Sequence, residues 1–376
     1  MRIVYLSDLD GKGSGYKNLS VPLCEGLVNK GHEVKVLGLG YRGEEHHFNF
    51  SLIPAANFQE VFAMIQNLWN MWQFDVLIVA LDIPLQEQVL RQLQNRPFKY
   101  VGIMPIEADP LCASWAMVLM WMDKALIISK FGTEEAKKAG VNAEYIEVGI
   151  DTSSWRFPTP EERKAVRKSL FGADDDTFVI LTVADNQERK NLSAGMEIFK
   201  MFNEKVPNSR YALVTREFNM VGWKLRDYAQ VLGISKDLLI FERGMSFTQL
   251  WSIYAGADVF LLPSKAEGLG LPLLEAMAIG IPCVATECTG MKELLSDGRG
   301  YLVEPEYLHT DPFGNGHRYW INKEDAVDTL LWAYKKIGAD NVDERMETQL
   351  SKAREFVLQR DWQIGIDKLD EVLKNL

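Results

Sequence analysis

Two glutamates stand eight positions apart in the stretch EGLGLPLLE, with two glycines and a proline between them. A carboxylate can accept two hydrogen bonds from neighbouring hydroxyls such as those of a ribose. Glycines let the backbone approach a ligand because no Cβ lies in the way. Glu267 and Glu275 are therefore candidates for holding a sugar or a nucleotide. Taken alone the spacing is common, and a solvated loop charge followed by a carboxylate near a helix start would account for it equally well.

The local sequence predicts where these glutamates lie. The apolar run ADVFLLPS, residues 257–264, is typical of a buried strand, so Glu267 follows its carboxyl end. The next helix is predicted to begin at Leu271–Pro272, since proline suits the first helical turn, and to stop at Gly280. Glu275 then lies near the first turn of that helix, and both carboxylates can face one ligand.

The rest of the chain alternates short apolar runs with stretches of helical periodicity, which is typical of parallel α/β sheets. A stretch rich in proline, serine and aspartate at about residues 150–160 interrupts this alternation and predicts a domain boundary. We expect two Rossmann-like α/β domains, residues 1–152 and 153–360, with parallel sheets facing each other across a cleft that binds a ligand. The predicted strands are 2–7, 32–40, 74–81, 99–104, 124–129, 177–184, 210–215, 238–243, 257–264 and 281–286.

Composition excludes several classes of protein. A chain of 376 residues is long for one hydrophobic core, and its net charge of −11 argues against a nucleic-acid partner. The four cysteines have neither CxxC spacing nor histidine partners, so we expect no metal site. The N-terminus lacks the apolar core of a signal peptide. No uncharged apolar run approaches the roughly 20 residues of a membrane helix, so we expect a cytoplasmic protein.

The stretch PSKAEGLGLPLLEAMAIGIPCVATECTGMKEL resembles the donor-site segment of the family-4 glycosyltransferases of the GT-B fold, whose hallmark is this glutamate pair. The resemblance extends along nearly the whole chain, through a glycine loop after the first strand, VGIDTSSWRF at the domain junction, ERKNL, and a C-terminal DWQ helix. It implies a helix at 361–376 that packs back on the first domain. It also implies metal-independent, retaining transfer of a sugar from a nucleoside-diphosphate sugar, with no further cofactor. The acceptor would be a hydroxyl of a glycan, a lipid-linked molecule or a small molecule.

The resemblance assigns roles around the glutamates. Glu275 would hold the ribose hydroxyls of the donor. Glu267 would contact the donor sugar with help from the backbone amides of the loop. The three loop residues are Gly268, Leu269 and Gly270.

Arg189 and Lys190, in VADNQERKNL, would bind the donor diphosphate. Two cations there would stabilise the negative charge that develops on the leaving nucleotide. Relatives often carry an arginine earlier in this loop, where this chain has Asp185 or Asn186. In this chain, Arg189 would therefore have to supply the positive charge that the earlier arginine supplies in those relatives.

Two backbone segments complete the implied donor site. Amides of Gly13, Ser14 and Gly15 would face the diphosphate from the first domain, and backbone near Arg243 and Gly244 would line the base pocket. The glycine loop alone also suggests a dinucleotide oxidoreductase. That alternative is disfavoured because the spacing is GxGxG, and because the second strand ends without the acid that binds an NAD ribose.

One position departs from the family pattern. Many relatives place a histidine after the fourth strand of the first domain, where this chain reads GIMPIEADP. Glu107 there, or Asp109, would contact a sugar hydroxyl or take a proton from the acceptor, or else be structural. The departure leaves open a second class of function, a catalytically impaired GT-B partner subunit.

Tryptophans cluster at residues 67–72 and 115–122. Packing in the core or the cleft is the plain explanation, since neither stretch is flanked by the lysines of an interfacial helix. The alternative is contact with a lipid-linked acceptor or peripheral contact with the inner face of a membrane.

Overall fold

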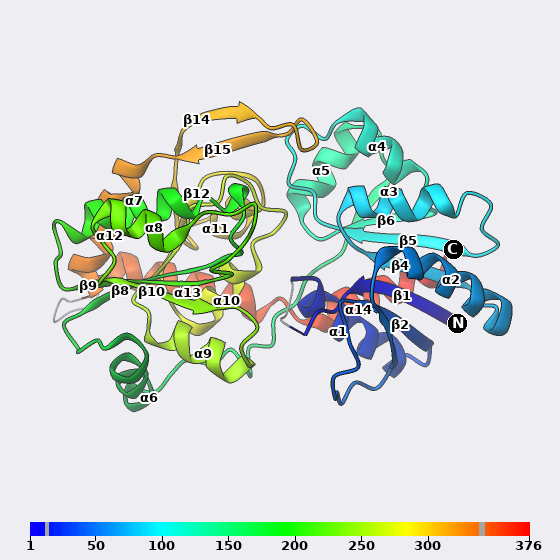
Figure 1. Cartoon of the computed structure of the whole chain (residues 1–376), viewed down its shortest axis with the longest axis horizontal. Helices are drawn as coiled ribbons and strands as arrows, with labels where there is room; N and C mark the ends of the chain where they lie inside the picture. The colour runs from blue at the N-terminus through cyan, green and yellow to red at the C-terminus, as the bar shows by residue number, and fades with distance from the viewer. Residues whose placement is uncertain (12–14, 338–342) are drawn as a thin grey trace. The chain divides into compact units, whose positions relative to one another are not determined.

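The computed structural model describes residues 1–11, 15–337 and 343–376, which divide into two units. Unit 1 comprises Met1–Gly149, Pro312–Gly316 and Arg360–Leu376, and unit 2 comprises Ile150–Asp311 and His317–Gln359. The sequence places the first boundary at 152/153 and the second at 360/361. The short insertion at 312–316 has no counterpart in the sequence prediction. Figure 1 shows both units in ribbon form.

Unit 1 is built on a seven-stranded sheet with the order β3-β2-β1-β4-β5-β6-β7. Every neighbouring pair is parallel, so all the strands end at the same edge of the sheet. Most of these strands are buried runs of β-branched and aliphatic residues, as expected for a parallel sheet covered on both faces. The strands are β1 (Arg2–Asp8), β2 (Glu33–Leu39), β3 (Ser51–Ala55), β4 (Val76–Ala80), β5 (Lys99–Met104), β6 (Lys124–Ile127) and β7 (Ala143–Tyr145).

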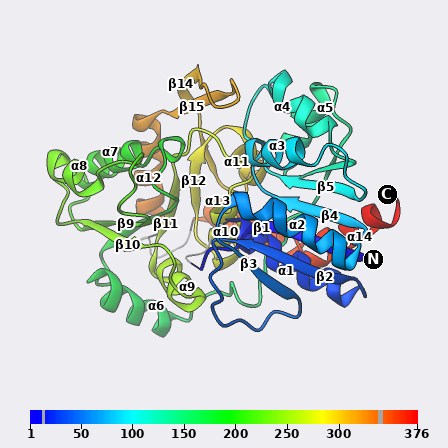
Figure 2. The same cartoon turned by 45° about the vertical axis from the view of Figure 1, so that its right-hand side comes forward.

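The helices of unit 1 cover this sheet, as Figure 2 shows for α2 and α3. Apolar side chains of α2, α3 and α4 join one core cluster with those of the strands. Helix α1 packs against β1 and β2, and the C-terminal helix α14 lies beside α1. The helices are α1 (Gly15–Asn29), α2 (Phe58–Trp72), α3 (Ile83–Gln92), α4 (Ala113–Met120), α5 (Lys130–Lys138) and α14 (Trp362–Lys374).

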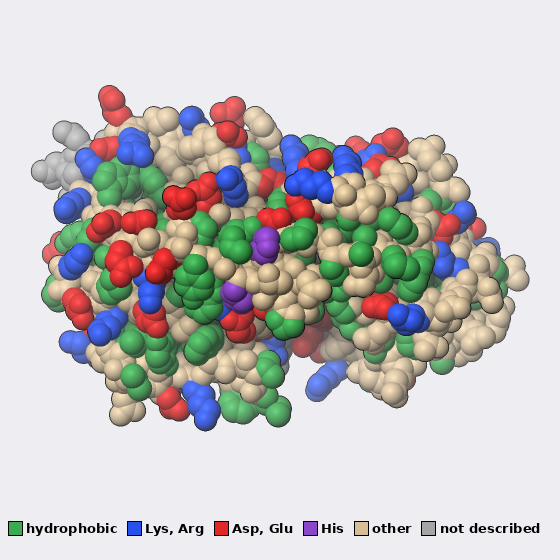
Figure 3. Space-filling model, turned by 90° about the horizontal axis from the view of Figure 1, so that it is seen from above, with side chains coloured by type: hydrophobic (Ala, Val, Ile, Leu, Met, Phe, Trp, Pro, Cys, Tyr) green, Lys and Arg blue, Asp and Glu red, His purple; other side chains and the backbone are tan. Residues whose placement is uncertain are grey.

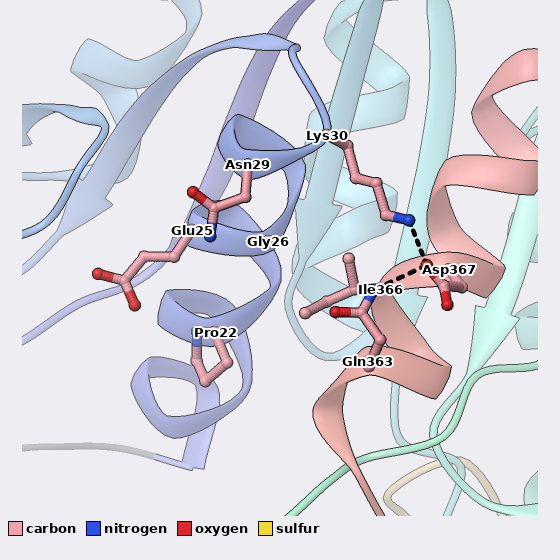
Figure 4. A pocket seen from close by; sticks show the side chains of 8 residues that line it. All are labelled: Pro22, Glu25, Gly26, Asn29, Lys30, Gln363, Ile366 and Asp367. Atoms are coloured by element: carbon pink, nitrogen blue, oxygen red, sulfur yellow. Dashed lines mark hydrogen bonds and ion pairs between the residues drawn. The ribbon is translucent and has the colours of Figure 1, made fainter.

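A hollow of about 590 Å³ lies between α1 and α14 (Figure 4). Its lining mixes apolar residues such as Ile366 with charged ones, and Lys30 Nζ pairs with Asp367 at 2.5 Å. Gly26 lets the helices approach, because a Cβ at that position would collide with Ile366. None of the predicted site residues lines this hollow.

Unit 2 is built on a six-stranded parallel sheet with the order β10-β9-β8-β11-β12-β13. The loops that follow β8, β9, β10, β11 and β12 all leave from the carboxyl edge of this sheet, where parallel sheets bind ligands. The strands are β8 (Phe178–Val183), β9 (Ser209–Thr215), β10 (Leu238–Glu242), β11 (Val259–Leu262), β12 (Cys283–Thr286) and β13 (Tyr301–Val303).

Helices pack in pairs in unit 2: α7 against α12, α10 against α13, and α6 against α9. Helix α10 begins and ends where the sequence predicts, because Pro272 lies in its first turn and Gly280 caps its end with a φ of 84°. The helices are α6 (Pro160–Val166), η1 (Arg167–Phe171), η2 (Glu188–Lys190), α7 (Leu192–Asn203), α8 (Leu225–Leu232), α9 (Phe247–Gly256), α10 (Leu271–Ile279), α11 (Thr289–Leu295), α12 (Lys323–Ile337) and α13 (Glu344–Leu358).

An antiparallel hairpin, β14 (Pro305–Thr310) and β15 (His317–Ile321), follows the sheet of unit 2. Figure 3 views the molecule from the side on which β14 and β15 lie, where apolar, acidic and basic side chains are mixed. Within the described ranges, none of the helices combines the length and apolarity required to cross a membrane.

Candidate functional site

Glu267 lies among cations at the carboxyl edge of the unit 2 sheet. Lys190 Nζ lies 2.7 and 2.8 Å from the two carboxylate oxygens of Glu267, and Arg189 Nη1 lies 3.1 Å from one of them. Both cations come from η2, which follows β8, whereas Glu267 lies in the loop between β11 and α10. The structure therefore brings the predicted cation pair together with the predicted glutamate, which lies 77 positions from Lys190 in the sequence.

Residues that the sequence analysis missed hold this loop in place. Ser264 Oγ donates to the Glu267 carboxylate at 2.6 Å. The backbone N–H of Glu267 donates to Thr289 Oγ1 at 2.9 Å, and the N–H of Gly290 donates to the Glu267 carbonyl at 3.0 Å. A Cβ on Gly290 would lie 2.8 Å from the Cα of Leu269, so the start of α11 packs directly on the loop. The one sequence signal for Thr289 and Gly290 is their place just after a predicted strand.

The glycine loop between the two glutamates is buried. Gly270 has a φ of 97°, a left-handed conformation that favours glycine, and it precedes the first residue of α10. The Leu269 side chain is 2% exposed, so this residue can offer a ligand only its backbone. That arrangement fits the expected use of the amides of Gly268, Leu269 and Gly270, which remains a prediction.

Glu275 lies on α10, buried against an aromatic cluster. Tyr254 of α9 donates its hydroxyl to Glu275 Oε2 at 2.6 Å. The Tyr254 ring stacks on Phe260 with a centroid distance of 5.7 Å and meets Trp155 edge-on at 5.1 Å. The carboxylate is thus oriented by a hydroxyl that is itself held rigidly.

The two glutamates have opposite electrostatic environments. Burial raises the pKa of Glu267, but Lys190 and Arg189 lower it more, and the pKa falls to about 2. Burial raises the pKa of Glu275 to about 7, although the Tyr254 hydroxyl acts in the opposite direction. Glu267 is therefore ionised at neutral pH, while Glu275 exchanges its proton there. In the part of the chain that the structure describes, no three His, Cys, Asp or Glu side chains gather as ligands for a metal ion.

A second charged group lies at the ends of β8, β9 and β10. Asp185 accepts from Arg216 Nη2 at 2.6 Å, and Arg243 Nη1 lies 3.4 Å from the same carboxylate. Gly244 follows with a φ of 90°. Arg216 was not predicted from the sequence. It supplies a cation beside Asp185, where relatives were expected to carry an arginine in the loop itself. Asn186 is buried and binds the backbone of Trp223.

Three of the residues predicted in unit 1, namely Gly15, Glu107 and Asp109, are described, and they lie beyond the carboxyl ends of their strands. Gly15 is the first residue of α1, after β1, whereas Gly13 and Ser14 lie outside the described residues. Glu107 and Asp109 are half-buried in the segment that follows β5. Their predicted roles toward a ligand stay predictions.

Two doubly wound parallel sheets, with a glutamate and two cations at the carboxyl edge of the second, are the features of a GT-B protein. Residues 164–329 match the family described as "Glycosyl transferases group 1". The predicted resemblance to glycosyltransferases is confirmed over these residues.

Curated relatives match about half of the chain. The chain is 29% identical over 216 residues to the D-inositol 3-phosphate glycosyltransferase of Thermobifida fusca, covering 50% of this chain and 48% of that protein. It is 27% identical over 185 residues to the mannosylfructose-phosphate synthase of Agrobacterium fabrum, covering 48% of this chain and 37% of that protein. The chain therefore spans less than half the length of these two relatives.

Solved structures resemble the whole chain in fold. The sucrose-phosphate synthase of Thermosynechococcus elongatus superposes with a TM-score of 0.78 at 14% identity, over 100% of this chain and 98% of that one. The Anabaena protein HepE, solved in complex with UDP-glucose, gives a TM-score of 0.76 at 17% identity, over 100% of both chains. At such identities the likeness establishes the fold alone.

Proposed function

We propose that the chain is a glycosyltransferase that moves a sugar from a nucleoside diphosphate to an acceptor hydroxyl. The observation that carries this proposal is the contact of Arg189 and Lys190 with Glu267 at the carboxyl edge of the unit 2 sheet. A carboxylate there can accept hydrogen bonds from sugar hydroxyls, and the adjacent cations can bind phosphate oxygens. HepE was solved with a nucleoside-diphosphate sugar of the proposed donor class.

The chemistry follows from this charge arrangement. The bond between the anomeric carbon and the diphosphate oxygen breaks, and Arg189 and Lys190 stabilise the charge left on the diphosphate. The acceptor oxygen forms its bond on the same face of the sugar and passes its proton to the departing phosphate, which gives retention. Glu107 is the proposed contact for a sugar or acceptor hydroxyl. We propose that the reaction needs no cofactor or metal, so that activity persists in EDTA.

The test is thermal melting of the wild type and of Glu275→Ala with UDP, GDP, ADP, their sugar conjugates and NADH. A ligand at a hundredfold excess over its Kd adds about 2.7 kcal/mol to the free energy of unfolding. Stabilisation by one nucleotide family is expected, with loss in Glu275→Ala and retention in Glu204→Ala, an exposed carboxylate of the same unit. Stabilisation by NADH alone would contradict the proposal. Binding without turnover would favour the impaired partner subunit.

We further propose that α4 makes peripheral contact with the inner face of an anionic membrane. Met117 and Met120 are exposed on it, Trp121 is exposed directly after it, and Arg91 lies 5.6 Å from the Trp121 ring. Apolar side chains beside cations suit a membrane interface. The expected result is co-sedimentation with phosphatidylglycerol vesicles and not with phosphatidylcholine vesicles, weakened in Met120→Glu. Equal recovery with both vesicle types, or none, would contradict it.

A further inference from the structure

Lys265 is a fully buried cation two positions before Glu267. Its side chain is 0% exposed, and its ammonium group pairs with Glu188 of η2. The same nitrogen lies 3.5 Å from the centre of the Trp320 ring. Burying an ammonium group costs free energy unless charge and polarisable surface compensate. Glu188 and Trp320 therefore hold Lys265 in one place.

The backbone of Lys265 joins two further segments of unit 2. Its N–H donates to the carbonyl of Arg189 at 2.8 Å, and its carbonyl accepts from the N–H of Tyr319 at 2.9 Å. Arg189 in turn donates from Nη1 to the carbonyl of Ala266 at 2.5 Å. The loop after β11 is thus attached to η2 on one side and to the hairpin strand β15 on the other.

The hairpin fixes the aromatic ring that covers Lys265. Trp320 donates from Nε1 to His309 Nδ1 at 2.8 Å. The Trp320 ring also stacks on Tyr307, with 5.3 Å between centroids and 17° between planes. Both partners come from β14, so the pairing of the two strands sets the position of the Trp320 ring.

The helix η2 needs such attachments. It has three residues, Glu188–Lys190, and a 3-10 turn of that length has little stability of its own. Asn191 ends it in a left-handed conformation with a φ of 54°. The orientation of the two cations therefore depends on contacts from outside the turn.

We propose that Lys265 is a positioning residue for the donor diphosphate, holding Glu188 and hence the turn that carries Arg189 and Lys190, with Trp320 of the hairpin as its support. This inference rests on the proposed function and deepens it. Lys265 is buried and acts through the turn. The readout is therefore how strongly the protein distinguishes a nucleoside diphosphate from the corresponding monophosphate.

The experiment measures Kd for UDP and UMP, GDP and GMP, and ADP and AMP, using the pair that the wild type binds best. The variants are Lys265→Met, Glu188→Gln and Trp320→Leu, with Lys164→Met as a control, since Lys164 pairs with Asp175 on the surface. Losing an oriented charge-assisted contact should lower diphosphate affinity by about tenfold. Monophosphate affinity should change by less than about twofold. Lys265→Arg should recover part of the loss, because it keeps the charge.

Three results are distinguishable. A tenfold fall in the preference for diphosphate, in variants that melt cooperatively, supports the inference. An unchanged preference in Glu188→Gln overturns it and leaves the proposed function standing; Glu188 is 55% exposed at its side chain, so this variant should fold even if Lys265→Met does not. Failure of the wild type to bind any of the six nucleotides overturns the proposed function and this inference with it.

Discussion

Glu267 and Glu275 differ in protonation although both are buried. The folded pKa of Glu267, about 2, lies below the ordinary value of 4.5, so its stabilising contribution is present above pH 4.5 and is lost as pH falls toward 2. The folded pKa of Glu275, about 7, lies above 4.5, so its contribution is present below pH 4.5 and is lost as pH rises through 7. Glu267, beside two cations, therefore stays ionised at neutral pH, whereas Glu275, beside the Tyr254 phenol, can gain or lose a proton there.

The affinity for a nucleoside diphosphate should depend on pH through Glu275. Ribose hydroxyls donate to an ionised carboxylate, so binding should weaken by up to about tenfold for each pH unit below 7. In Tyr254→Phe the hydroxyl that lowers the pKa of Glu275 is absent, and the midpoint of the profile should move to higher pH. Titration calorimetry from pH 5.5 to 8.5 measures both profiles.

A suitable control for that experiment is Tyr334→Phe, which changes a partly exposed phenol on α12. Its profile should match that of the wild type. A flat profile in the wild type would mean that Glu275 does not hold the ribose.

At the scale of elements, the start of α11 shapes the glutamate loop. Thr289 adopts a left-handed φ of 44°, which is unusual for a β-branched residue. Its hydroxyl accepts from the Glu267 N–H, and the next residue packs on the loop. Strained backbone at such a position persists where surrounding contacts determine it.

Gly290→Ala tests this support. The added methyl group would lie 2.8 Å from the Cα of Leu269 and 2.9 Å from the carbonyl of Gly268, so the loop must move. We expect a loss of about 1–3 kcal/mol in the free energy of unfolding. We also expect the variant to bind a nucleoside diphosphate about tenfold more weakly than the wild type does. Denaturant unfolding and calorimetry measure these, with Lys292→Ala on the exposed side of α11 as the control. Unchanged affinity would show that the loop tolerates the shift.

The sequence predicts the central strands of both parallel sheets and α10, but not the edge strands β3, β7 and β13 or the hairpin. Buried strands show as apolar runs, and α10 is delimited by Pro272 and Gly280. The strand β14 is mostly exposed and β15 is half-buried or buried, without the regular alternation that marks a strand in a sequence. The hairpin also makes contacts distant in sequence, such as that of Trp320 with Lys265. Likewise, the hydrogen bond from the Glu267 N–H to Thr289 joins residues 22 positions apart, so it cannot be predicted from local sequence patterns.

At the scale of the whole molecule, unit 1 is assembled from three segments of the chain. Helix α14 completes it through glycines that leave room for close packing: a Cβ on Gly365 would collide with the carbonyl of Glu147, and one on Gly149 with the backbone of Trp362. His32 and Asp370 add a buried contact at 2.9 Å between the nitrogen and the carboxylate.

Gly365→Ala should therefore weaken the packing of α14 on unit 1. Overpacking against backbone atoms costs about 1–3 kcal/mol, since the carbonyl cannot yield as a flexible side chain can. Differential scanning calorimetry should register an earlier unfolding transition. Ser351→Ala, at an exposed position of α13, is the matched control. If Gly365→Ala and Ser351→Ala unfolded at the same temperature, the close packing of α14 at Gly365 would be contradicted.

The division of unit 1 among three segments also affects the order of events during synthesis. The seven strands of its sheet leave the ribosome first, but residues 360–376 emerge only after those of unit 2. Unit 2 is continuous apart from the short excursion at 312–316. The nascent chain therefore exposes the part of unit 1 that α14 later covers while the second sheet is still being translated, a period during which a chaperone would have a defined surface to protect.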